Sequence, residues 1–127
     1  MVVPSGASDD RPMSSVVGMG DGLPITVAVT SDGGETTVTV GGELDMATTP
    51  TLADVLRERI AEGPSRLILD LADVTFMGSS GLAVLVAAHD QAAEHNVDVV
   101  LTRLPEVVRR PLVTTALDTR FDIRDSA

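Results

Sequence analysis

A short apolar run between charged residues constrains the fold of this chain most. Residues 66–71 read Arg-Leu-Ile-Leu-Asp-Leu, a pattern typical of a strand that is buried on both faces of a sheet. Apolar residues recur with the period of a helix before and after this run, over residues 49–62 and 82–95. A strand that lies between two helices pairs in parallel with its neighbours, because each helix serves as a crossover connection. The sequence therefore predicts an α/β fold.

The segment before the first helix predicts an antiparallel hairpin. Apolar and polar residues alternate over residues 25–30 and 37–40, and Ser31-Asp32-Gly33-Gly34 between them favours a tight turn. Residues 97–101 and 121–123 predict two further strands. We expect a single mixed β-sheet with an N-terminal antiparallel hairpin and with helices covering the sheet.

Particular residues predict where the helices begin and end. Thr49 is expected to cap the first helix, with Pro50 at its first position. Asn96 suits the left-handed conformation that ends many helices, here the second one. Pro105 opens a third helix, and Pro111 is expected to kink or split it.

The first 22 residues carry no periodic apolar pattern. They are rich in Ser, Gly and Pro, which predicts a disordered tail over residues 1–22. A length of 127 residues favours one domain, and we place that domain at residues 23–127.

Composition excludes several classes of function. The formal net charge is −10 and only 2% of the residues are aromatic, so we expect no binding of nucleic acid and no binding to anionic membranes. Cys is absent, which excludes disulfides and Cys-based zinc sites. With neither a signal peptide nor an apolar run of about 20 residues, the chain is expected to be cytoplasmic.

Two serines stand between glycines at the start of the second helix, in the order Gly78-Ser79-Ser80-Gly81. If Ser79 caps the helix, Ser80 lies in the first turn, where backbone N–H groups have no intrahelical acceptor. A phosphate on Ser80 would gain from those donors and from the helix dipole. The alternative is that Ser79 is only a cap and Ser80 only a small residue of the first turn.

The sequence gives no support to catalysis or to a bound cofactor. A hydrolase nucleophile elbow needs Gly two residues before and two residues after the Ser, and neither Ser79 nor Ser80 has both. His89 and His95 are six residues apart on the expected helix and diverge by about 240°, so they would not share a metal ion. The chain also lacks a phosphate-binding loop of the Walker type. We expect no catalytic residue, no metal and no cofactor.

Three segments resemble the STAS domain family of anti-sigma factor antagonists, in its actinobacterial form. Gly42-Glu43-Leu44-Asp45 resembles the family's approach to its first helix. The segment from Leu69 to Leu82 resembles its phosphorylation segment, where a strand runs into a helix through "F-x-D-S-S-G-L". Arg109-Arg110-Pro111-Leu112, which leads to Leu117-Asp118, resembles the final helix.

The resemblance implies a partner switch that regulates transcription, for example in a stress response. The unphosphorylated antagonist binds an anti-sigma factor, usually a serine kinase of the histidine-kinase-like ATPase type, and the sigma factor is released. Phosphorylation of the antagonist then breaks the complex. Ser80 aligns with the usual acceptor and Ser79 is the second candidate. The family often has Asp where this chain has Gly78. The partner-binding residues implied are Asp45, Gly78, Ser79, Ser80, Gly81 and Leu82.

A second function remains open within the same family. STAS domains also serve as binding subunits of lipid-transport ATPase complexes or as parts of stress-sensing scaffolds, without a phosphorylation switch. A single domain that carries both serines favours the antagonist.

Overall fold

Strand β5 lies near the middle of one sheet that organises the whole domain. The computed structural model describes residues 13–17 and 25–124. In this part of the chain six strands pair in the order β2-β3-β4-β5-β6-β7. The pairs from β2 to β4 are antiparallel, and those from β4 to β7 are parallel. The predicted α/β class, with a mixed sheet and an N-terminal antiparallel hairpin, is confirmed.

The hairpin forms where the alternation of residues predicts it. Strands β3 (Ile25–Asp32) and β4 (Glu35–Leu44) are joined by two residues, and Asp32 pairs with Glu35 across the turn. Gly33 and Gly34 have φ of +60° and +89°. Positive φ at both central residues is the geometry of the tight turn that matches the twist of the two strands.

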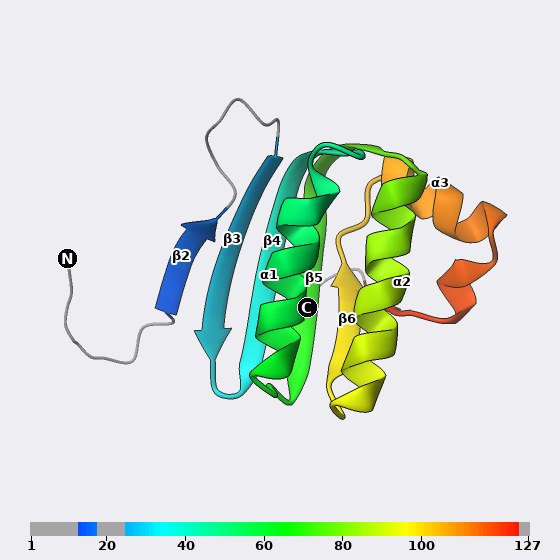
Figure 1. Cartoon of the computed structure of the whole chain (residues 1–127). Helices are drawn as coiled ribbons and strands as arrows, with labels where there is room; N and C mark the ends of the chain where they lie inside the picture. Colours follow the sequence, from blue (N-terminus) through cyan, green and yellow to red (C-terminus); the bar gives the residue numbers. More distant parts are fainter. Residues whose placement is uncertain (1–12, 18–24, 125–127) are drawn as a thin grey trace.

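Two long helices lie side by side across one face of the sheet, as Figure 1 shows. They are α1 (Thr49–Ala61) and α2 (Ser79–Glu94). Their apolar faces pack on alternate residues of the strands, and together these side chains form one core. Its fully buried large members are Leu44, Leu52, Leu56, Ile60, Leu67, Leu69, Leu71, Leu85, Leu101, Leu112, Val27 and Val38.

The end of the chain adds a short helix and an edge strand. β6 (Asp98–Thr102) is followed by α3 (Glu106–Thr114), the 3-10 turn η1 (Leu117–Thr119) and β7 (Asp122–Arg124). The left-handed conformation predicted for Asn96 is confirmed, with φ of +59°.

Two predictions about the limits of helices and strands are wrong. Helix α3 is not split at Pro111 but continues through it to Thr114; a proline removes only one intrahelical hydrogen bond, and Val108 and Leu112 anchor the helix in the core on either side of it. Strand β5 runs from Arg66 to Met77, so residues 73–77 belong to the strand and are not a connection. They pair in parallel with residues 41–44 of β4, and this ladder supplies the hydrogen bonds that the local sequence does not predict.

The predicted disordered tail also needs correction. Within residues 1–22, the segment Met13–Val17 forms strand β2, which pairs antiparallel with β3 from Val27 to Ser31. The edge of β3 offers unpaired backbone groups, and these bind a segment that has no apolar periodicity of its own. The rest of the predicted tail lies outside the described residues.

Candidate functional site

The candidate site is built where β4 and β5 end side by side. The last paired residues are Leu44 and Met77, and both strands then lead into the helices that cover the sheet. The backbone N–H of Gly78 donates to the carbonyl oxygen of Leu44 at 3.0 Å. The parallel ladder thus brings the loop after β4 and the start of α2, which are more than thirty residues apart in sequence, into one place.

The loop between β4 and α1 is held by two side chains. The carboxylate oxygen Oδ1 of Asp45 accepts hydrogen bonds from the backbone N–H groups of Ala47 at 2.9 Å and of Thr48 at 3.2 Å. The hydroxyl of Thr48 donates to the carbonyl of Glu43 at 2.6 Å and accepts from the N–H of Asp45 at 3.0 Å. Thr48 is fully buried, so it acts as a rigid internal brace for this loop.

The start of each helix differs by one residue from the prediction. Thr48 and Gly78 are the N-cap residues, so Thr49 and Ser79 are the first helical residues and not the caps. Neither helix has a side-chain hydrogen bond at its cap. In α1 the hydroxyl of Thr48 instead forms hydrogen bonds with the backbone of Glu43 and Asp45 in the preceding loop. In α2 the cap is a glycine, with φ of −92°, an ordinary extended value.

The two serines present different surfaces. Ser79 is exposed and Ser80 is half-buried. They occupy the first and second positions of α2, where amide N–H groups have no partner within the helix. Among the described residues the first amide of the helix to find an acceptor is that of Gly81, which donates to the carbonyl oxygen of Gly78 at 3.0 Å. The N–H groups of Ser79 and Ser80 are therefore free to donate hydrogen bonds to an anion that binds at this helix start.

Gly81 and Leu82 contribute to packing more than to the surface. A Cβ added at Gly81 would lie 2.7 Å from Cγ of Met77 and 3.1 Å from Cβ of Leu44, so only glycine fits there without displacement. Leu82 packs against the hydrophobic core. Of the six residues predicted to bind a partner, Ser79 is exposed, Gly81 is buried and the other four are half-buried. The loop with Asp45 and the start of α2 lie at the same end of the sheet.

Two exposed apolar side chains at the same end were missed by the sequence analysis. Met46, in the loop after β4, is 85% exposed, and Phe76, near the end of β5, is 49% exposed. The ring of Phe76 lies close to Gly78, since a Cβ there would be 3.4 Å from its Cε2. Thr75 and Phe76 are both exposed between buried Val74 and Met77, where the pairing of β5 with β4 shifts register, so the exposure of Phe76 does not follow from strand alternation. We call Met46, Phe76, Ser79 and Ser80 the serine patch.

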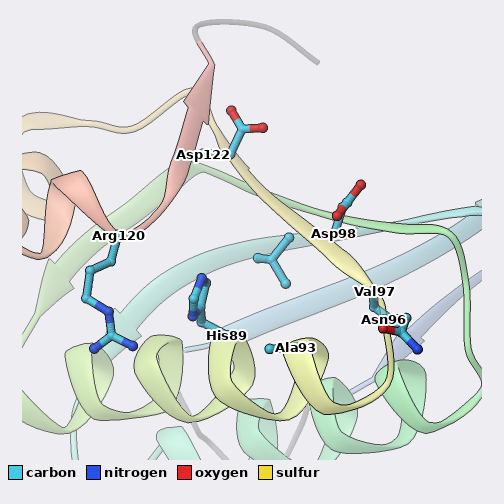
Figure 2. A pocket seen from close by; sticks show the side chains of 8 residues that line it. His89, Ala93, Asn96, Val97, Asp98, Arg120 and Asp122 are labelled. Carbon is cyan, nitrogen blue, oxygen red and sulfur yellow. The ribbon is translucent and has the colours of Figure 1, made fainter.

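A hollow of about 670 Å³ lies at the other end of α2, and Figure 2 shows it from close by. The guanidinium group of Arg120, which lines the hollow, donates to the carboxylate oxygen Oδ1 of Asp90 on α2 at 3.1 Å. The ring of His89 packs edge-on against Phe121 with 5.1 Å between ring centres. Two hydrogen bonds from Arg124 hold the pKa of Asp122 below its ordinary value. These charged groups are of mixed sign and largely paired with one another, so the hollow offers a weaker case for a site than the serine patch.

Residues 13–17 and 25–124 lack two further kinds of feature. No group of three or more His, Cys, Asp or Glu residues there is arranged to hold a metal ion. In the same part of the chain, no helix combines the length and the apolar character that crossing a membrane requires.

Comparison with known proteins agrees with this geometry. The STAS domain family matches residues 26–127, which is well over half of the chain. The chain belongs to the STAS domain family. The resemblance noted from the three sequence segments is therefore confirmed.

The relatives of this STAS domain include bacterial regulators. It is 35% identical over 97 residues to the anti-sigma-F factor antagonist RsfB of Mycobacterium tuberculosis, a match that covers 76% of this chain and 79% of that protein. The crystal structure of an anti-sigma factor antagonist from Mycobacterium paratuberculosis superposes with a TM-score of 0.71 at 35% identity, covering 80% of this chain and 86% of that one. Unphosphorylated SpoIIAA, an anti-sigma factor antagonist, matches with a TM-score of 0.61 at 18% identity, over 71% of this chain and 79% of that one, and supports the fold alone.

Proposed function

We propose that this STAS domain is an anti-sigma factor antagonist with a phosphorylation switch at Ser80. In its unphosphorylated form it binds an anti-sigma factor, a serine kinase of the histidine-kinase-like ATPase type, in the cytoplasm, and a sigma factor is released. The kinase then phosphorylates Ser80 and the complex dissociates. The protein acts by binding and not by catalysis. The relatives named above, which are antagonists at 35% identity, support this proposal.

The observation that carries the proposal is the place of Ser80 in the fold. It is half-buried in the first turn of α2, at the end of the sheet where Met46 and Phe76 expose apolar side chains. An exposed apolar pair next to a helix start favours contact with another protein. A serine hydroxyl in such a contact is small and neutral, so a partner can cover it at little cost if the hydroxyl keeps a hydrogen bond.

Phosphorylation at this position would change the surface and leave the fold intact. The phosphate would lie near the free amides of the first turn and near the positive end of the helix dipole, an interaction worth about 0.3–1 kcal/mol per charge at exposed sites. It would add about −1.5 to −2 units of charge to a contact surface. A charge of that size, buried in a complex without a matching cation, costs about 2–5 kcal/mol, which weakens binding by a factor of roughly 30 to several thousand.

Two pairs of variants test the switch. Ser80→Ala is expected to bind the anti-sigma factor as the wild type does and to resist phosphorylation. Ser80→Glu is expected to fold normally and to bind at least tenfold more weakly. Ser79→Ala and Ser79→Glu are measured in parallel, because Ser79 is the second candidate acceptor and lies next to Ser80 on the exposed side of the same helix turn. Calorimetric titration of the anti-sigma factor, melting curves and phosphosite mapping are the measurements.

The outcome also separates the two functions of the family. Wild-type-like binding by Ser80→Glu, together with no phosphate on Ser79 or Ser80 after incubation with the kinase and ATP, would refute the switch. Co-purification of a membrane transporter in place of a kinase would then assign the chain to the binding subunits of lipid-transport ATPases. Phosphate on Ser79 alone would move the switch to the second candidate.

A further inference from the structure

A shallow apolar groove lies between α1 and α2, the two helices that lie side by side in Figure 1. It encloses about 280 Å³. One wall comes from α1 and the other from α2, and at the far end the side-chain amide of Gln91 donates to the carbonyl oxygen of Arg57 at 3.2 Å. The lining consists mostly of small or apolar residues, among them Ala53, Ala83 and Ala87.

Ser80 lies in line with this groove. Residues three, four and seven positions apart share one face of a helix, since each residue turns the helix by about 100°. Ala83, Val84 and Ala87, which line the groove, are three, four and seven residues after Ser80. The groove therefore continues directly from the serine patch along α2, and a partner that covers Ser80 meets the groove next.

The serine patch by itself is too small for a stable complex. A specific interface uses about 20–30 residues on each side, and the patch has four. The surface that continues it must supply the remainder. Ala83 and Ala87 are exposed, and alanines at these positions leave room for the side chains of another helix to settle between α1 and α2.

We propose that this groove seats an amphipathic helix of the anti-sigma factor, with one end of that helix over Ser80. The inference rests on the proposed function and names the mode of contact. The occupant carries small or medium apolar residues at positions i, i+3 or i+4, and i+7, which is the pattern by which helices bind in grooves. An extended segment would instead bind at the edge of a sheet, through backbone hydrogen bonds.

Charge indicates that the occupant is basic. The chain has a formal net charge of −10. Of the eight arginines within the described residues, seven form ion pairs with carboxylates of the chain, including Arg57, which lines the groove and pairs with Asp54. Glu94 is exposed on α2, seven residues after Ala87 and therefore near the same face. Lys or Arg residues on the flank of the bound helix would complement this end of the groove and speed association.

The test fills the groove and leaves the serines untouched. Ala87→Leu and Ala83→Leu add bulk at exposed positions of α2, so both variants are expected to fold. Ala93→Leu is the matched control, because Ala93 is an exposed alanine of the same helix that points about 120° away from Ala87. The probe is the purified anti-sigma factor of the host that binds the wild-type chain, titrated calorimetrically, with hydrogen exchange used to map the bound segment.

We expect Ala87→Leu and Ala83→Leu to bind at least fivefold more weakly than Ala93→Leu, which binds as the wild type does. The segment of the anti-sigma factor that becomes protected should have the helical apolar spacing and flanking Lys or Arg. A loss smaller than fivefold for both groove variants, or a protected segment of alternating strand pattern, would overturn the inference. So would a wild-type dimer that Ala87→Leu dissolves, since the groove would then seat a second copy of this chain.

Different experimental outcomes would refute the groove contact and the proposed function. If Ser80→Glu loses binding while the groove variants keep it, the switch stands and the groove is not part of the contact. If no anti-sigma factor of the host binds the wild-type chain, the proposed function is wrong and the inference falls with it.

Discussion

Replacing Thr48 by Val should destabilise the domain at the loop that carries Met46. Val has nearly the same shape as Thr and removes only the hydroxyl. That hydroxyl donates to the carbonyl oxygen of Glu43 at 2.6 Å and accepts from the N–H of Asp45 at 3.0 Å. The substitution therefore removes two hydrogen bonds from a residue that is 0% exposed and leaves the packing volume unchanged.

The size of the effect follows from the surroundings of the two partners. A hydrogen bond contributes about 0.5–1.5 kcal/mol net, and a buried group left without a partner costs about 1–3 kcal/mol. Both hydrogen bonds are partly buried, so water solvates the carbonyl oxygen of Glu43 and the N–H of Asp45 only in part after the change. We expect a total loss of about 2 kcal/mol, which is a large part of the roughly 5–15 kcal/mol that a domain of this kind has.

Urea denaturation of Thr48→Val and of Thr49→Val measures this loss. Thr49 is the matched control, because it is the next residue and is 6% exposed while its hydroxyl lies outside the hydrogen bonds that hold the loop. We expect the midpoint to fall for Thr48→Val with an unchanged slope, and to fall much less for the control. Equal midpoints for the two variants would refute the role of Thr48 as a brace of this loop.

Three further predictions follow from the same end of the domain and from the sheet edge. Gly78→Asp should raise the melting point, since the helix cap has ordinary φ and an acidic cap gains about 0.3–1 kcal/mol from the helix dipole; a lower melting point would contradict the cap assignment. Gly81→Ala should cost about 1–3 kcal/mol in urea denaturation, because its Cβ would lie 2.7 Å from Met77, and a stability equal to wild type would show that the helix start can shift. Deletion of residues 1–12 should leave the melting curve unchanged, whereas deletion of residues 1–22 removes β2 from the edge of β3 and should cause self-association in sedimentation experiments.

Much of this architecture could be predicted because it depends on local patterns. The alternation of residues 25–30 and 37–40, with Gly33 and Gly34 between, defines a hairpin within one short stretch of chain. The apolar period of α1 and the double burial of residues 67–69 are likewise visible in neighbouring residues. The position of Ser80 at the start of a helix that follows a buried strand was predicted for the same reason.

The parallel pairing of the later strands could also be predicted from the sequence, although their order in the sheet could not. A strand between two helices pairs in parallel, and β4, β5 and β6 do so. This places the loop after β4 beside the start of α2. The shared end of the sheet for the loop with Asp45 and for the serines follows from this pairing, whereas the hydrogen bond from Gly78 to Leu44 depends on the tertiary structure.

Other features depend on contacts between residues that are distant in sequence, and only the tertiary structure decides them. Strand β2 exists because the edge of β3 supplies hydrogen bonds to Met13–Val17, and β5 extends to Met77 because β4 pairs with it there. The exposure of Met46 and Phe76 depends on which neighbouring elements leave them uncovered. The groove beside Ser80 arises from the packing of α1 against α2. Its shape depends on the side chains of both helices and on how the helices pack, which the sequence of either helix alone does not predict.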